Sequence, residues 1–291
     1  MPAEAAGAIT APVLAAVLCG AMLHASWNAL IKGGTDKSLD TALIHGLGIV
    51  VALPVVAVVG LPARAAWPFL ATSVVVHLGY YLALVGAYRH GDLGLTYPVM
   101  RGLAPLLVAT SSAALIGEPL GAAAWAGVLA VSGGVIAIGL SRGTGGGHPA
   151  KALRYALANA AIIALYTVID GLGVRASGHA LSYVATLFLF EGLPYLSLVL
   201  WQRRERLAET LAHVRVRWPL ALAGTAASFG SYAIALWAMT QAPVALVAAL
   251  RETSVLFAAL LGALWLKEGF GVQRVLGTLL VVAGVMALRL A

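Results

Sequence analysis

Two apolar stretches of the chain decide the fold: PVMRGLAPLLVATSSAALIGEPL at 98–120 and LRETSVLFAALLGALWLKEGF at 250–270. Arg101 and Arg251 lie 150 residues apart, and Glu118 and Glu268 have the same separation. Charged residues are rare in sequence of this kind. Two charged pairs at one offset therefore indicate an internal repeat.

The repeat extends on both sides of these pairs. The offset stays at 150 or 151 for several glycines and one tyrosine, and near the start of each half Trp27 aligns more loosely with Tyr166. The further matched pairs are Gly79 with Gly230, Tyr81 with Tyr232, Gly127 with Gly277, and Gly134 with Gly284. We predict two homologous halves, 1–140 and 152–291, joined by a Gly-rich linker at 141–151.

The composition places the chain in a membrane. It is 61% hydrophobic and 10% charged, with a mean hydropathy of +0.95, whereas soluble domains are about 25% charged. The net charge of +7 does not indicate nucleic-acid binding, because the basic residues lie mostly between apolar runs. The single cysteine, Cys19, excludes an internal disulfide and a cysteine-based metal cluster.

Runs of about 20 apolar residues predict ten membrane-spanning helices, and hence an all-α integral membrane protein. The first run is expected to be a span and not a cleavable signal, because Glu4 and no Lys or Arg precedes it. The basic segment 202–217 is expected to be a solvated loop or a short interfacial helix. The predicted spans are 9–31, 39–59, 67–88, 93–116, 121–140, 152–173, 180–201, 218–240, 243–266 and 271–290.

The distribution of Lys and Arg predicts the orientation. Loops after the odd-numbered spans hold about thirteen of these residues and the opposite side about three, so both termini are expected outside the cytoplasm. Five spans per half is an odd number, so equivalent helices must run in opposite directions. Inverted repeats of this kind place a substrate site near the middle of the membrane, where the halves meet.

Ionisable residues inside apolar spans are costly and therefore suggest function. A guanidinium offers a planar donor fork that suits a carboxylate or a phosphate, so Arg101 and Arg251 are candidates for holding an anionic substrate group. A structural ion pair, such as Arg251 with Asp170, is the alternative interpretation. Glu252, Glu191 and Asp170 are candidate proton carriers, although Glu252 is equally compatible with a packing network.

Polar and aromatic residues recur four apart on several predicted spans, as His24 and Asn28 do on the first. This spacing puts each pair on one helix face and favours the lining of a cavity over single helix–helix hydrogen bonds. The candidate substrate-binding residues are His24, Trp27, Asn28, His77, Tyr81, Tyr97, Arg101, Tyr166, Tyr232 and Arg251. Ala126, Ala130 and Gly134 form a small-residue ridge, so the fifth and tenth spans are expected to form scaffold or a homodimer contact of an otherwise monomeric chain.

Motifs of enzymes are missing from the sequence. It contains no G-x-x-x-x-G-K-[ST], H-E-x-x-H or G-x-S-x-G, which argues against a nucleotide motor, a zinc protease and a serine hydrolase. We predict no catalytic residues, no metal and no cofactor. A membrane enzyme acting on a lipid-linked substrate would need clustered carboxylates or histidines, whereas Asp40, His45 and His90 are scattered.

The segment HASWNALIK at 24–32, with the two stretches quoted first, resembles the EamA family of the drug/metabolite transporter superfamily. The resemblance covers essentially the whole chain and is strongest to bacterial amino-acid exporters, including those for aromatic amino acids. It implies a multi-pass protein of the inner membrane. It also implies a cavity lined by spans one, three, four, six, eight and nine, which hold Asn28, Tyr81, Arg101, Tyr166, Tyr232 and Arg251. Glu252 lies opposite Gly102 in the repeat, so the cavity departs from exact symmetry.

The expected function is therefore export of amino acids, including aromatic or hydrophobic ones, or of similar small metabolites by alternating access. The alternative within transport is a carrier for sugar-like or phosphorylated solutes, in which Arg101 and Arg251 would act together on a phosphate. A membrane-embedded enzyme is the third interpretation.

Overall fold

The computed structural model describes residues 9–90, 93–140, 149–258, 260 and 271–291. Within these ranges the chain is a bundle of helices connected by short turns. In chain order the elements are α1 (Ala11–Lys32), α2 (Lys37–Gly46), α3 (Gly48–Val59), η1 (Arg64–Ala66), α4 (Trp67–His90), α5 (Leu93–Leu115), α6 (Ala122–Leu140), α7 (Pro149–Ala176), α8 (Ala180–Gln202), η2 (Arg204–Arg206), α9 (Leu207–Met239), α10 (Val244–Arg251) and α12 (Val272–Leu290).

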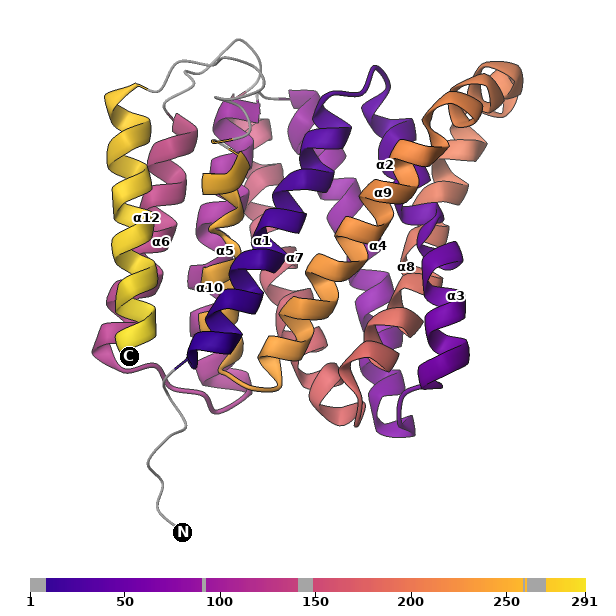
Figure 1. Cartoon of the computed structure of the whole chain (residues 1–291). Coiled ribbons are helices and arrows are strands. Elements are labelled where there is room, and N and C mark those ends of the chain that lie inside the picture. The colour runs from indigo at the N-terminus through magenta and orange to yellow at the C-terminus, as the bar shows by residue number, and fades with distance from the viewer. Residues whose placement is uncertain (1–8, 91–92, 141–148, 259, 261–270) are drawn as a thin grey trace.

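The predicted all-helical membrane fold is confirmed. Nine helical segments of the described ranges are long and apolar enough to cross a membrane, with α2 and α3 together forming one of them. The ninth predicted span, 243–266, lies partly outside the described residues, as do Glu268 and most of the predicted linker 141–151. The beginning of α1 and the end of α12 lie at the same end of the bundle (Figure 1).

The most extensive helix contacts join the first half of the chain to the second. α1 packs on α9, α4 and α5 pack on α7, α3 packs on α8, and α6 packs on α12. α6 and α12 form one edge of the bundle, and α3 and α8 lie at the opposite edge (Figure 1). α1 and α7 run in opposite directions, as the predicted inverted halves require.

Glycines bring α6 and α12 into direct backbone contact. A Cβ atom placed on Gly134 would lie 2.7 Å from the carbonyl oxygen of Gly277, and one on Gly127 would lie 3.0 Å from that of Gly284. The predicted ridge is therefore correct only in part, because Ala126 is exposed and the contact face runs through Gly127. The scaffold interpretation accounts for this packing, while dimerisation through these helices stays a prediction.

Two helix boundaries differ from the predicted ones. The expected span 39–59 is broken at Leu47, where α2 ends and α3 begins. Glycines allow α8 to approach this break closely: a Cβ on Gly192 would lie 2.2 Å from the carbonyl oxygen of His45.

The expected loop or interfacial helix at 202–217 is wrong beyond residue 206, because α9 starts at Leu207 and continues for 33 residues. At 1.5 Å per residue that helix is about 50 Å long, so it extends beyond a hydrocarbon core of about 30 Å.

The expected span at 243–266 is also interrupted. α10 ends at Arg251, a turn occupies Glu252 and Thr253, and helical residues resume at 254. The backbone N–H groups of Glu252, Thr253 and Val255 bond to carbonyls three residues earlier, at 3.0–3.1 Å. Discontinuous helices of this kind expose polar backbone and charged side chains in the middle of transporters.

Candidate functional site

Arg101 and Glu252 form a buried ion pair between the two halves. Arg101 Nε on α5 lies 2.9 Å from Glu252 Oε2 at the end of α10, and the side chains are 10% and 6% exposed. Arg101 Nη2 also donates to Ser254 Oγ at 3.5 Å. The interruption after α10 thus places a carboxylate and a hydroxyl against the guanidinium of the other half.

Asp170 on α7 is fully buried and is held by two tyrosines. The Tyr183 hydroxyl donates to Asp170 Oδ1 at 2.8 Å, and the Tyr232 hydroxyl donates to Oδ2. The expected alternative of an Arg251–Asp170 ion pair is therefore wrong. Arg251 instead lies over Tyr232, with its Cζ 5.3 Å from the ring centroid.

Tyr166 lies between these groups, one helical turn before Asp170 on α7. Its hydroxyl interacts electrostatically with both guanidiniums, Arg101 and Arg251, and with the carboxylates Glu252 and Asp170. The sequence-predicted charges are thus brought together around one phenol.

A second buried carboxylate, Glu191 on α8, faces two histidines. His45 Nδ1 lies 3.5 Å from Oε1, and His77 Nε2 lies 3.7 Å from Oε2. His77 stacks on Tyr166 with a centroid distance of 4.4 Å. This cluster therefore adjoins the ring of charges around Tyr166.

Aromatic rings form the remaining wall. Tyr81 stacks on Tyr195 at 4.7 Å, and its hydroxyl lies 3.1 Å from His45 Nδ1. Trp27 packs edge-on against His24 at 5.1 Å and His45 at 6.0 Å. Trp27 Nε1 is buried and has no hydrogen-bond partner among the described residues. The wall is therefore built of aromatic rings that meet mostly edge to face.

Not every predicted residue joins this site. Asn28 turns back to its own helix and donates to the carbonyl oxygen of His24 at 2.7 Å. The side chain of Tyr97 lies outside the described part of the structure.

The sequence reasoning missed His45, Tyr183 and Tyr195 as site residues. Tyr195 follows Glu191 by four residues, so helical spacing was a signal that could have found it. His45 had no such signal, because its partners come from α4 and α8.

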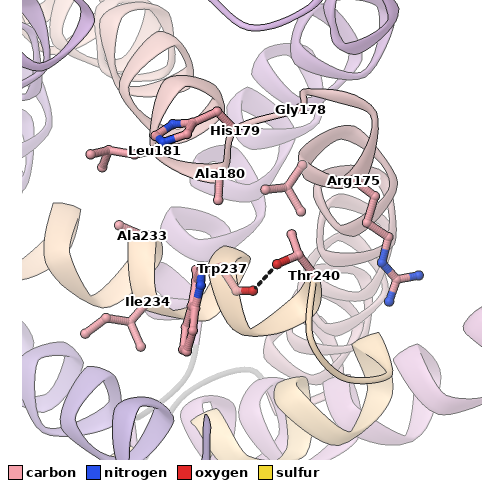
Figure 2. A pocket seen from close by; sticks show the side chains of 10 residues that line it. Arg175, Gly178, His179, Ala180, Leu181, Ala233, Ile234, Trp237 and Thr240 are labelled. Carbon is pink, nitrogen blue, oxygen red and sulfur yellow. Dashed lines mark hydrogen bonds between the residues drawn. The ribbon is translucent and has the colours of Figure 1, made fainter. Parts of the chain in front are cut away.

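An open pocket of about 810 Å³ lies at the end of the bundle where α7 and α9 end and α8 begins (Figure 2). Its lining includes Val174, Leu181 and Ala233. Val174 is four residues after Asp170 on α7, and Ala233 follows Tyr232 on α9. The pocket therefore comes within about one helical turn of the Asp170 cluster, or roughly 6 Å of helix rise.

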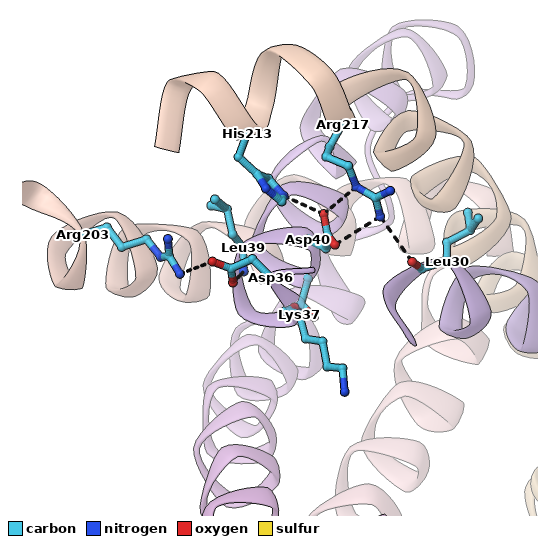
Figure 3. Close-up of polar contacts among 9 residues, drawn as sticks. Leu30, Asp36, Lys37, Leu39, Asp40, Arg203, His213 and Arg217 are labelled. Atoms are coloured by element: carbon cyan, nitrogen blue, oxygen red, sulfur yellow. Dashed lines mark hydrogen bonds and ion pairs between the residues drawn. The ribbon is translucent and has the colours of Figure 1, made fainter. Parts of the chain in front are cut away.

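At the opposite end, acidic residues of α2 and its N-cap bind basic residues near and on α9 (Figure 3). Asp40 is 3% exposed and contacts His213 Nε2 at 2.9 Å and Arg217 Nε at 3.1 Å. Asp36, the N-cap of α2, pairs with Arg203. We call these five residues the α2–α9 ion-pair network; it joins the two halves at the end opposite the pocket.

A further ion pair joins the halves beside the pocket. Arg175 Nη1 donates to Glu118 Oε1 at 2.6 Å, and Glu118 Oε2 accepts from the backbone N–H of Val244 at 3.0 Å. Glu118 thus ties the α5–α6 connection to both α7 and the start of α10.

The fold and the buried charges between its halves define a multi-pass helical membrane protein. Residues 150–290 match the model of the EamA-like transporter family. One solved structure, titled "Crystal structure of protein", shares 22% sequence identity with a TM-score of 0.71 and covers 94% of this chain and 96% of its own. That similarity shows the fold. A comparison with curated proteins found no match.

Proposed function

We propose that this protein is a secondary transporter that exports amino acids, or similar small zwitterionic metabolites, across a bacterial-type inner membrane. The substrate site is the buried group of charges and aromatic rings around Tyr166. Arg101 and Arg251 bind the substrate carboxylate, Glu252 binds its ammonium group, and Tyr81, Tyr195 and Trp27 contact its side chain. In this proposal both termini lie outside the cytoplasm.

The observation that carries the proposal is the buried Arg101–Glu252 pair. Breaking a buried pair by removing one partner leaves an uncompensated charge and costs about 3–5 kcal/mol. A zwitterion avoids this cost because its carboxylate satisfies Arg101 while its ammonium satisfies Glu252. The buried donor Trp27 Nε1 offers a further contact to a substrate oxygen.

The charge balance argues against the phosphorylated-solute alternative. Two guanidiniums, of Arg101 and Arg251, share the site with three carboxylates, of Glu252, Asp170 and Glu191. A phosphate would pair with Arg101 but would leave Glu252 buried beside a second anion.

Access to the site is proposed to alternate between the two ends. The pocket at one end approaches Asp170 and Tyr232, whereas the α2–α9 ion-pair network joins the halves at the other. Rocking of the halves would exchange these arrangements, since inverted-repeat transporters move one repeat against the other around a fixed site. The proposed orientation makes the pocket the outward opening.

The proposal is tested by uptake of a labelled panel of the twenty amino acids into liposomes that hold the purified protein. We expect uptake of a subset, strongest for aromatic or hydrophobic members, and its loss in Arg101→Ala and in Tyr81→Ala. Arg204→Ala is the matched control, because Arg204 lies on η2 with a side chain that is 59% exposed, and it should transport normally.

Absence of uptake for every amino acid would contradict the proposal. Competition with the panel by sugars and sugar phosphates belongs in the same experiment. Inhibition or transport by sugar phosphates alone would select the phosphorylated-solute alternative.

A further inference from the structure

His45, Glu191 and His77 form a buried cluster beside the residues proposed to bind the substrate. The three side chains come from α2, α8 and α4, so the cluster joins helices of both halves. Each oxygen of the Glu191 carboxylate faces a different imidazole, at 3.5 Å and 3.7 Å, and Glu191 is 6% exposed. We call these residues the His–Glu–His cluster.

The hydrogen bonds of His77 fix where its proton lies. His77 Nδ1 is 2.9 Å from the carbonyl oxygen of Ser73, and a carbonyl oxygen can only accept, so Nδ1 carries a hydrogen. In the neutral ring Nε2 then presents a lone pair to Glu191 Oε2. Two lone pairs facing each other in a buried site repel, so this contact requires a proton on Glu191 or on Nε2.

His45 can accommodate a change in the number of protons. Its Nδ1 faces both Glu191 Oε1 at 3.5 Å and the Tyr81 hydroxyl at 3.1 Å. A hydroxyl both donates and accepts. His45 therefore keeps a partner whether Nδ1 carries a hydrogen or accepts one.

A polar connection leads from the cluster toward the pocket. Ser73 Oγ lies 3.1 Å from His77 Nδ1, and Ser73 also interacts with the carboxylate of Asp170. Asp170 is one helical turn from the pocket lining at Val174. Ser73 and His77 thus connect Asp170, one helical turn from the pocket lining, to Glu191.

The other titratable groups near the cluster lie on α4, α7, α8 and α9, whereas α3, which also packs on α8, has none in its sequence. They are Tyr80 and Tyr81 on α4, Tyr166 and Asp170 on α7, Tyr195 on α8 and Tyr232 on α9. All but Asp170 are tyrosines, which are neutral near pH 7. Besides Asp170, the two histidines and Glu191 are therefore the side chains of this region that can carry an exchangeable proton near neutral pH.

We propose that the His–Glu–His cluster is the proton-binding site that couples substrate export to proton entry. This inference rests on the proposed transport function. The other two candidate proton carriers already have other partners. Glu252 forms an ion pair with Arg101, and Asp170 accepts hydrogen bonds from two tyrosine hydroxyls. A proton is required while α2, α4 and α8 are in contact and is released when rocking separates them, which couples the proton cycle to the conformational cycle.

The test uses proteoliposomes that contain the full chain and a substrate found with the amino-acid panel. Counterflow measures transport without a gradient, and a pH-sensitive dye trapped in the lumen reports proton movement. We expect substrate and protons to move in opposite directions. With one proton per substrate, a gradient of one pH unit should drive about tenfold accumulation.

Glu191→Gln and His77→Gln should abolish both the accumulation and the substrate-dependent dye signal. Glu205→Gln, on a side chain that is 86% exposed, is the matched control and should retain both. His45→Gln provides a third variant if either of the others fails to elute as a folded protein in size-exclusion chromatography.

The experiment distinguishes failure of the coupling inference from failure of the transport proposal. Counterflow by the wild type without accumulation driven by a pH gradient overturns the coupling inference and leaves the transport proposal standing. Full proton coupling in Glu191→Gln, or loss of coupling in Glu252→Gln alone, also overturns the inference. Absence of counterflow for every amino acid overturns the transport proposal itself.

Discussion

Arg217 of α9 donates two hydrogen bonds to Asp40 of α2, from Nε to Oδ1 at 3.1 Å and from Nη2 to Oδ2 at 3.2 Å. The same Nη2 donates to the carbonyl oxygen of Leu30 at 3.4 Å, near the end of α1. One guanidinium therefore joins three helices at the end of the bundle opposite the pocket. If the halves rock during transport, these bonds must break in each cycle.

Weakening this contact should change both stability and transport. Asp40→Asn removes charge-assisted hydrogen bonds, each contributing about 1.5–3 kcal/mol, and should lower the melting temperature in detergent by several degrees. Gly34→Ala should act similarly without removing a charge, because its Cβ would lie 1.8 Å from Asp40 Oδ2. Glu205→Gln is the control, and a melting temperature unchanged in both variants would show that the contact is not stabilising.

The Arg101–Glu252 pair should show strong energetic coupling. Arg101→Gln removes the guanidinium that pairs directly with the buried Glu252 carboxylate, so it should destabilise the protein by about 3–5 kcal/mol. The double variant Arg101→Gln/Glu252→Gln should recover a large part of that loss, since no unpaired charge remains. Thermal unfolding of the two single variants and the double variant measures the coupling. Simple additivity of the single effects would contradict a direct interaction.

Substitutions of the two tyrosines that hydrogen-bond Asp170 should differ in their effects on stability and on substrate affinity. Tyr183→Phe removes a hydrogen bond to a fully buried carboxylate and should destabilise the protein by about 1.5–3 kcal/mol. Tyr232→Phe removes the other bond but keeps the ring beneath Arg251, so substrate affinity should fall less than in Tyr232→Ala. Melting temperatures and uptake at several substrate concentrations test this. Equal affinity in both Tyr232 variants would rule out a role for the ring.

Adjacent glycines of α6 provide a matched test of helix packing. Gly134→Ala would place Cβ 2.7 Å from the backbone oxygen of Gly277 on α12, whereas Gly133→Ala would approach only the Leu280 side chain, at 3.6 Å. Overpacking costs about 1–3 kcal/mol, so Gly134→Ala should lower the melting temperature and Gly133→Ala should leave it nearly unchanged. Similar melting temperatures for the two variants would mean that α6 and α12 separate easily.

Most of the helical spans followed from apolar length, because a bilayer accepts only segments that satisfy their own backbone hydrogen bonds. The incorrect helix boundaries concern segments to which this rule does not apply. α9 extends beyond the bilayer through Arg215 and Arg217, where charge suggested a loop. The interruption after Arg251 falls at the polar residues 251–254, and the stretch 244–258 contains no proline or glycine, so no helix-breaking residue marked it.

Apolar length and composition established the membrane class and placed Arg101, Asp170, Glu191, Arg251 and Glu252 within predicted spans. The packing of the helices against one another determined which of these groups meet: Arg101 with Glu252, Asp170 with Tyr183 and Tyr232, and Glu191 with His45 and His77. The physical reason is that lipid-facing and protein-facing surfaces of a membrane helix are both apolar. The sequence pattern therefore does not reveal how each helix is rotated, and pairs formed between helices depend on that rotation.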